Sequence, residues 1–299
     1  MLTFHTLDVF TTTAFCGNPL AVVLGADNLT TAQMQAIARE FNLSETIFVQ
    51  SPQDPANTAR VRIFFPTAEI PFAGHPTIGC AILLATEAHW LGDFKMEMVL
   101  EEEAGLVPVT VTRRDGQTQA EFTAPVMPHA APGEALPEAI AQAIDIEEKY
   151  IGFGMHHPGI WAGGPAFLYV PVANLDMLAR ARPIEPYWSE LMDRAWVDSA
   201  YLYTPGTGCD FQARMFSPTA GIPEDPATGS ATAILAAQLR ASRALRMGNQ
   251  DFSLMQGVEM GRPSQLFLSI DNGPDGIEAV RIRGAAVPMA QGRIRVPSL

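Results

Sequence analysis

The sequence predicts an α+β protein built from two similar domains, and three observations indicate this. The length of 299 residues suits two domains of ordinary size. Hydrophobic residues make up 47% of the chain and charged residues 17%, which is enough apolar side chain to fill real cores. Finally, one pattern of Arg, Phe, Pro, Thr, Ala and Ile occurs twice, about half a chain apart.

The repeated pattern joins residues 62–71 to residues 214–223. With a short gap, Gly79 then aligns with Gly229, and each copy runs from a strand through a Pro-rich turn into an apolar helix. Two copies are too few for a solenoid, which needs several stacked repeats. We therefore expect two domains related by a pseudo-two-fold axis, with both helix starts directed into one cleft.

The remaining elements follow from hydrophobic periodicity and turn residues. Thr31 is the expected cap of the first helix and Asn42 its expected stop, whereas the acidic run 101–103 is expected to be an exposed turn. A stretch rich in Pro, Ala and Gly, 125–137, is the expected linker. The predicted helices are 30–41, 80–86, 137–144, 188–195 and 231–239. The predicted strands are 2–10, 20–24, 47–50, 60–65, 94–100, 106–112, 119–122, 166–172, 200–204, 210–216, 266–270, 279–283 and 285–290.

Composition excludes several classes of partner. A net charge of −13 argues against nucleic acid and anionic membranes. The first residues resemble no signal peptide, and no apolar stretch reaches the length of a membrane span. The three cysteines are far apart and offer no metal-site spacing. We therefore expect a cytoplasmic protein that binds no metal, nucleic acid or membrane.

The acidic turn 224–230 precedes the small-residue helix of the second half. A helix start presents unpaired backbone N–H groups and a partial positive charge, which suit a carboxylate or phosphate. Asp225 supplies a side chain at this point, and Gly229 and Ser230 supply N–H donors. The same pattern also fits a helix that is merely capped after an acidic turn.

Three polar residues of the first half are further candidates. Glu45 stands at the mouth of an apolar strand, where burial would raise its pKa towards neutrality, although an edge glutamate could equally face water. His75 lies in a Gly-His-Pro turn at a helix start, where the imidazole tends to stay neutral. Asn18 lies in a Gly-Asn-Pro turn and either faces a ligand or serves the turn alone.

Glu45, His75 and Asp225 together suit proton abstraction beside a carbonyl, carboxylate or conjugated π-system, followed by delivery of the proton elsewhere. This chemistry requires no cofactor, and the sequence contains no nucleophile elbow, phosphate-binding loop, dinucleotide fingerprint or zinc motif. Ser199 falls near the place of Glu45 in the second half, so only one half carries this carboxylate. Two other readings remain, a cofactor-free epimerase with Glu45 and Asp225 as opposing bases and a non-catalytic small-anion-binding protein.

Five short motifs are spread over most of the chain, at 17–23 (GNPLAVV), 42–46 (NLSET), 71–79 (PFAGHPTIG), 224–231 (EDPATGSA) and 261–264 (GRPS). Together they resemble the PhzF family of phenazine biosynthesis-like proteins. The resemblance implies a diaminopimelate epimerase-like fold, in which two pseudo-two-fold related domains each wrap a β-barrel-like sheet around a central α-helix. It also implies a homodimer with the active site in the cleft between the domains. We expect an N-terminal domain of residues 1–126, completed by the C-terminal strand 286–299, and a C-terminal domain of residues 127–285.

The resemblance also implies roles for the candidate residues. The family's phenazine enzyme is an isomerase of trans-2,3-dihydro-3-hydroxyanthranilate, in which the glutamate that matches Glu45 moves a proton between ring carbons. His75 and Asp225 match residues that hold the substrate and tune this transfer. The expected substrate is a small carboxylate, and the residues expected to bind it are Asn18, Gly74, Gly229 and Ser230.

Related amino-acid epimerases use one thiol from each domain as a pair of bases. In this sequence Cys80 and Cys209 lie outside the motifs, which argues against thiol-based epimerisation. The resemblance therefore implies a cofactor-independent isomerase that works through a carboxylate.

Overall fold

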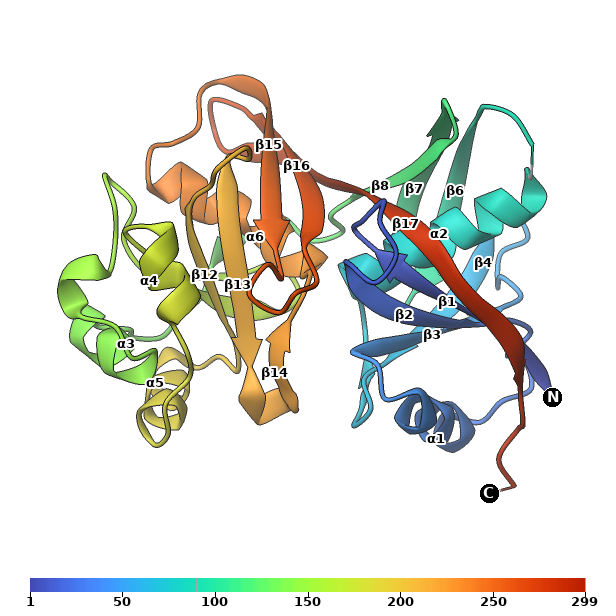
Figure 1. Cartoon of the computed structure of the whole chain (residues 1–299). Coiled ribbons are helices and arrows are strands. Elements are labelled where there is room, and N and C mark those ends of the chain that lie inside the picture. The colour runs from blue at the N-terminus through green and yellow to red at the C-terminus, as the bar shows by residue number, and fades with distance from the viewer. Residues whose placement is uncertain (90, 299) are drawn as a thin grey trace. The chain divides into compact units, whose positions relative to one another are not determined.

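The computed structural model describes residues 1–89 and 91–298, and the chain forms an α+β structure, as predicted (Figure 1). Leu299, the last residue of the expected C-terminal strand, lies outside the described residues. Two compact units divide the chain. The first comprises Met1–Pro125 and Ile282–Leu299, and the second comprises Val126–Arg281. No helix within the described residues is long and apolar enough to cross a membrane.

Eight strands of the first unit close into a barrel, because β17 pairs with both β1 and β8 at the two ends of the series β1–β2–β3–β4–β6–β7–β8. The sequence predicts two strands where β17 is continuous. The bounds are β1 (Leu2–Val9), β2 (Asn18–Val23), β3 (Glu45–Gln50), β4 (Ala59–Phe64), β6 (Phe94–Glu102), β7 (Gly105–Arg114), β8 (Gln117–Thr123) and β17 (Ile277–Ile294), with the short β5 (Glu69–Ile70) beside β4.

The barrel surrounds α2 (Gly74–Ala88), whose first ten residues and Ala85 are buried (Figure 1). A helix that is apolar on every side lacks a face for solvent, so a central position satisfies it. Packing is close enough that a Cβ atom added at Gly79 would lie 2.5 Å from the side chain of Leu20 and 2.8 Å from that of Val9. The strands of the barrel therefore fix the position of α2 tightly.

The first helix, α1 (Thr31–Phe41), packs on the outside of this barrel. Its cap is Thr30, one residue before the predicted Thr31, because the Thr30 hydroxyl accepts a hydrogen bond from the Gln33 N–H while the Gln33 side chain returns to the Thr30 N–H. Asn42 ends the helix in the left-handed conformation, as predicted.

The second unit repeats this plan around α6 (Gly229–Ala241). The first ten residues of α6 are buried except Ser230, and the surrounding strands also contribute many buried side chains. The strands pair in the order β9–β10–β11–β12–β13–β15–β16, with β14 beside β13. Their bounds are β9 (His129–Ala130), β10 (Gly159–Ala162), β11 (Ala166–Pro171), β12 (Ala200–Pro205), β13 (Phe211–Ser217), β14 (Ile222–Asp225), β15 (Gly248–Gln256) and β16 (Ser264–Asn272). Three further helices form a separate apolar cluster with this sheet, and they are α3 (Pro137–Ala143), α4 (Leu175–Arg180) and α5 (Tyr187–Ala195).

Strand register confirms the internal duplication. Phe64 and Phe216 are equivalent in the repeated pattern, and they pair with Thr46 and Ala200 respectively. The residue before Ala200 is Ser199, which therefore occupies the place of Glu45, as predicted. Its hydroxyl donates to Ser217 Oγ at 2.7 Å, so this position is a structural polar contact in the second unit.

The predicted alignment of the helices is wrong by five residues. The first residues of α2 and α6 are Gly74 and Gly229, so Gly229 is equivalent to Gly74 and not to Gly79. Thr77 and Thr232, each three residues further on, both donate to the backbone carbonyl four residues back. The difference arises because the second unit has three more residues, not fewer, between the end of the repeated pattern and its helix: residues 72–73 fill this gap in the first unit and residues 224–228 in the second.

The acidic run 101–103 is mostly buried, which corrects the predicted exposed turn. Strand β6 continues through Glu102, and the exposed fractions of Glu101 and Glu102 are 9% and 7%. Glu101 accepts hydrogen bonds from two backbone N–H groups of the 51–58 loop and from Asn57 Nδ2, which compensate for its charge. Glu102 instead points to the first turn of α2.

Candidate active site

Glu45 is the first residue of β3 and is 8% exposed. It pairs with Leu20 on the parallel strand β2, and the strand residues that follow it are buried. The reading in which Glu45 is an edge carboxylate facing water is therefore wrong. Its carboxylate is held at the start of an apolar strand, where few waters are available to solvate the charge.

His75 is the second residue of α2 and is 3% exposed. Burial lowers its pKa to about 3, partly offset by a backbone hydrogen bond with Pro19. The ring is therefore neutral at physiological pH, as the sequence predicts. The main cause is desolvation by burial, whereas the sequence predicts neutrality from the position at a helix start. A neutral imidazole has one N–H donor and one lone pair, so it can exchange hydrogen bonds without carrying a charge.

Asn18, Glu45 and His75 meet at one nitrogen atom. Asn18 Nδ2 lies 3.3 Å from His75 Nδ1, and Glu45 Oε2 lies 3.5 Å from the same atom. Asn18 begins β2 and is fully buried, so the three residues come from the starts of two strands and one helix. The amide nitrogen of Asn18 only donates, so a hydrogen bond between them requires the tautomer in which His75 Nδ1 carries the lone pair. The sequence motifs containing these residues give no sign of this contact.

Asp225 is held by a second group of polar residues, in the second unit. It ends β14 and is 5% exposed. Thr228 Oγ1 donates to Asp225 Oδ2 at 2.5 Å. Gln256, fully buried at the end of β15, donates from Nε2 to the Asp225 carbonyl at 2.8 Å and to Thr228 Oγ1 at 3.0 Å, and its Oε1 accepts from the Thr228 N–H at 3.1 Å. Sequence reasoning missed Thr228 and Gln256.

The two central helices, α2 and α6, differ from α1, α3, α4 and α5 in how the N-terminal end is stabilised. Side chains cap α1 and α4, through Thr30 and Asn174, while α3 and α5 have an acidic residue in the first turn, Glu138 or Glu190. In the part of the chain that the structure describes, only α2 and α6 start with neither feature. Their first N–H groups thus have no side-chain cap, and their first turns carry no acidic residue, which suits an anionic ligand.

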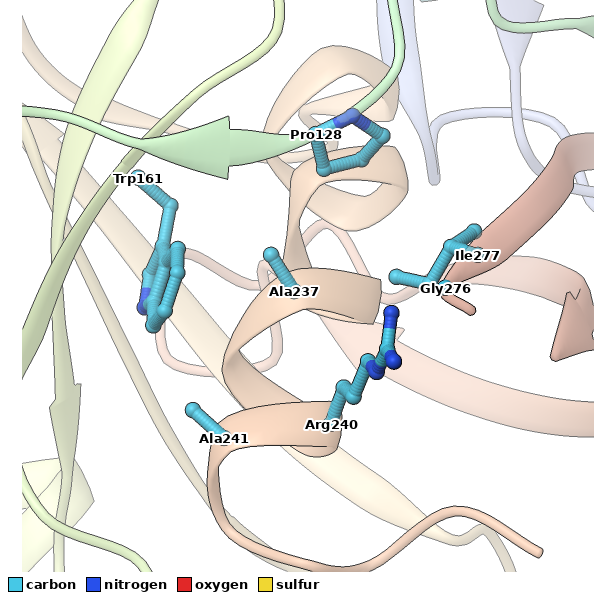
Figure 2. Close-up of a pocket in the computed structure, with 7 residues that line it drawn as sticks. All are labelled: Pro128, Trp161, Ala237, Arg240, Ala241, Gly276 and Ile277. Carbon is cyan, nitrogen blue, oxygen red and sulfur yellow. The ribbon is translucent and has the colours of Figure 1, made fainter. Parts of the chain in front are cut away.

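A separate groove of about 530 Å³ lies at the other end of α6 (Figure 2). Trp161 of β10 and Arg240 of α6 contribute its two largest side chains. The predicted site residues of this unit lie at the start of α6 and do not line the groove.

Full-length relatives agree with this architecture. A family model described as phenazine biosynthesis-like protein matches residues 7–292. An uncharacterized isomerase of Mesorhizobium japonicum is 43% identical over 293 residues, which cover 96% of each chain. The trans-2,3-dihydro-3-hydroxyanthranilate isomerase of Pseudomonas aeruginosa is 35% identical over 291 residues, which cover 96% of this chain and 97% of that enzyme. A PhzF-family phenazine biosynthesis protein of Bacillus anthracis has a crystal structure with a TM-score of 0.86 and 25% identity, covering 99% of both chains.

Two units that each wrap strands around a central helix, together with these relatives, define an isomerase with the diaminopimelate epimerase-like fold. More particularly, the chain belongs to the PhzC-PhzF family of phenazine biosynthesis-like proteins. The predicted fold, family and enzyme class are confirmed. The isomerase relatives also establish that the substrate is a small molecule.

Proposed function

We propose that this isomerase moves a proton within a small carboxylate substrate and that Glu45 carries the proton. The observation that carries the proposal is the buried Glu45 carboxylate, 3.5 Å from a neutral imidazole. Glu45 takes a proton from a carbon atom, and the electron pair of the broken C–H bond moves into the adjacent π-system. Protonated Glu45, whose carboxyl proton exchanges with solvent, then delivers a proton to another carbon, so the substrate is neither oxidised nor reduced and Glu45 returns to its initial state.

His75 supports this role because it remains neutral. An imidazole with an ordinary pKa would compete for the proton near pH 6.5, whereas the pKa of about 3 leaves the proton with Glu45 or the substrate. In the tautomer with its lone pair on Nδ1, His75 can accept a hydrogen bond from Asn18 or from protonated Glu45, one at a time, because both lie near this atom. We therefore assign His75 and Asn18 to orienting the proton carrier.

The carboxylate of the substrate is assigned to the uncapped helix starts. Gly229 and Ser230 at the start of α6, and Gly74 at the start of α2, have N–H groups that no side chain caps. Asp225 contributes a carboxylate whose orientation Thr228 and Gln256 fix, which suits contact with a hydroxyl or amino group of the substrate.

The first substrate to test is trans-2,3-dihydro-3-hydroxyanthranilate, because it is the substrate in the name of the 35% identical relative. It carries the carboxylate, the amino and hydroxyl groups and the conjugated system that the proposed site would recognise.

Solvent-deuterium exchange into this compound and a panel of small carboxylates tests the proposal. Wild type is expected to incorporate deuterium and to isomerise at least one compound. Glu45→Gln is expected to lose exchange by at least a hundredfold while binding the same ligand, because the amide cannot carry the proton. Glu40→Gln, at an exposed carboxylate on α1, is the matched control and should behave like wild type.

Full exchange by Glu45→Gln would refute the role of Glu45. Deuterium incorporated with inversion at a single carbon would instead indicate an epimerase. If wild type and the variant both bind a carboxylate and neither exchanges, the chain is an anion-binding protein on this fold.

We further propose that the enzyme is a cytoplasmic homodimer. The dimer rests on the family resemblance, and the location rests on three cysteines that are all free thiols. Light scattering during size exclusion tests the dimer, and a monomeric mass at micromolar concentration would contradict it.

A further inference from the structure

Glu102 is a buried carboxyl group that the proposed mechanism does not use. It ends β6, is 7% exposed and points to the first turn of α2, the helix that carries His75. Its Oε1 lies 2.7 Å from Thr77 Oγ1. Within residues 1–89 and 91–298, its Oε2 has no hydrogen-bond partner and no cation pairs with it. A carboxylate is costly in such a place, whereas a neutral carboxylic acid is not.

The Thr77 hydroxyl faces two oxygen atoms but has only one hydrogen to donate. A hydroxyl has one hydrogen, and Thr77 Oγ1 lies 2.8 Å from the Ala73 carbonyl as well as 2.7 Å from Glu102 Oε1. If the hydrogen goes to the Ala73 carbonyl, Glu102 must donate to Thr77, which requires a protonated carboxyl group. An ionised Glu102 would leave two acceptors facing one hydrogen.

The second unit shows the same arrangement with a tyrosine hydroxyl in place of the carboxyl group. Thr232, the equivalent of Thr77, donates to the Thr228 carbonyl at 3.0 Å, and the Tyr201 hydroxyl lies 3.2 Å from Thr232 Oγ1. When the hydrogen of Thr232 goes to the Thr228 carbonyl, Tyr201 is the donor to Thr232 Oγ1. Glu102 stands in the same relation to Thr77 as Tyr201 does to Thr232.

Strand register supplies an independent comparison. The repeated pattern makes Arg60 equivalent to Gln212, and these residues pair with Glu101 and Met255 respectively. The residue after Met255 is Gln256, so Gln256 is the equivalent of Glu102. Gln256 is neutral and supports the start of α6 with both donor and acceptor bonds. A protonated glutamic acid has nearly the shape of glutamine and offers the same two functions.

We propose that Glu102 is a positioning residue that acts as a neutral carboxylic acid, donating to Thr77 and thereby fixing the helix start that carries Gly74 and His75. This inference deepens the proposed function and rests on it for the link to catalysis. When Glu102 loses its proton, the Thr77 hydrogen must turn from the Ala73 carbonyl to the carboxylate. The first turn of α2 then loses a bond, and His75 loses its fixed orientation towards Glu45.

The surrounding titratable groups are compatible with a neutral Glu102. Burial raises the pKa of Glu102 to about 8, and the Thr77 hydrogen bond offsets only part of this. On α2, His75 is neutral, and burial raises the pKa of the Cys80 thiol far above its ordinary value, so that this group is neutral as well. On the same strand, Glu101 is committed to loop N–H groups, and the residue after Glu102, Glu103, pairs with Arg60. Catalysis should therefore weaken on the alkaline side as Glu102 ionises.

NMR of the His75 ring tests this inference without requiring turnover. In wild type the ring signals should shift with a midpoint near pH 8, as Glu102 ionises. In Glu102→Gln the shift should be absent, and in Thr77→Val, which cuts the link to the helix, it should be strongly reduced. Glu103→Gln, at the exposed neighbour, should retain the wild-type shift. A wild-type ring that does not respond, or an equal response in Glu102→Gln, would overturn the inference.

The pH–rate profile then tests the link to catalysis. Above the midpoint, kcat of wild type should fall by about tenfold per pH unit, because one ionisation removes the active form. Glu102→Gln should keep at least a tenth of the wild-type kcat at pH 7 and lose this alkaline decline. A decline that persists in Glu102→Gln refutes the positioning role. If the His75 signals shift as expected but no substrate exchanges deuterium, the proposed function is refuted. The inference that Glu102 is protonated in the folded protein is then still supported.

Discussion

Replacing Glu102 by Gln should change how stability depends on pH, by an amount that follows from the structure. The folded protein holds the Glu102 proton up to about pH 8, whereas the unfolded chain releases it near the ordinary value of 4.5. Between these values the folded state binds one more proton than the unfolded state, so raising the pH favours unfolding. This contribution of Glu102 is fully present below pH 4.5, declines through the interval and is lost above pH 8.

The expected slope is about 1.4 kcal/mol per pH unit for one proton. Across the interval from 4.5 to about 8, the free energy of unfolding of wild type should fall relative to Glu102→Gln by on the order of 5 kcal/mol. Comparison with the variant removes the titration of all other groups, because they are common to both proteins. The variant should therefore gain stability over wild type steadily as the pH rises from 5 to 8.

Urea unfolding of both proteins at half-unit pH intervals from 5 to 9 measures this difference. The Glu103→Gln variant is the control and should stay parallel to wild type. Parallel curves for wild type and Glu102→Gln would refute the reasoning, because they would mean that Glu102 has the same proton affinity in the folded and unfolded states. A variant that loses stability relative to wild type as the pH rises would refute it as well, since that sign belongs to a carboxylate stabilised by ionisation.

Three further results are expected from the geometry of the two units. NMR of His75 should report a neutral ring from pH 8 down to about pH 4, because burial lowers its pKa to about 3; a midpoint near 6.5 would contradict this. Thr228→Val should lower kcat/KM by roughly tenfold to a hundredfold, because Asp225 loses its short hydrogen bond, while Thr228→Ser should retain most of the activity. Gly79→Ala should lower the free energy of unfolding by roughly 1–3 kcal/mol in urea titrations, because the new methyl group would lie 2.5 Å from the side chain of Leu20, and an unchanged stability would contradict the close packing of α2.

The duplicated plan of the fold could be predicted because both copies of the repeat lie in apolar strands. Periodicity is strong there, so Arg60–Phe64 and Phe211–Ser217 were recognisable as equivalent strands. The start of α2 was not recognisable, because the Gly-His-Pro sequence favours a turn. The Gly-His-Pro sequence opens a helix here because Pro76 is the third helical residue. The N–H groups in the first turn of a helix have no partner within the helix, so a proline there costs no hydrogen bond.

The candidate site residues could be predicted individually, but their contacts could not. Glu45, His75 and Asn18 meet because strand register and the helix start bring together positions up to 57 residues apart. Gln256 ends β15, a strand whose mixed polar sequence gives no clear alternation. Glu102 lies in a run of three glutamates, which in a sequence favours the surface. Its burial depends on the pairing of β6 with β4, a long-range contact with no local signal.

The final strand has a consequence for how the protein is made. The barrel of the first unit closes only when β17 pairs with β1 and β8, and residues 282–294 supply this closure. During translation the other seven strands of this barrel are therefore synthesised first. The second unit follows, and the strand that closes the barrel is synthesised last. During that time β1 and β8 keep exposed edges, which are templates for pairing with other chains. The second unit, which depends far less on the tail, can fold first, so the N-terminal half of the molecule is the last to reach its native state.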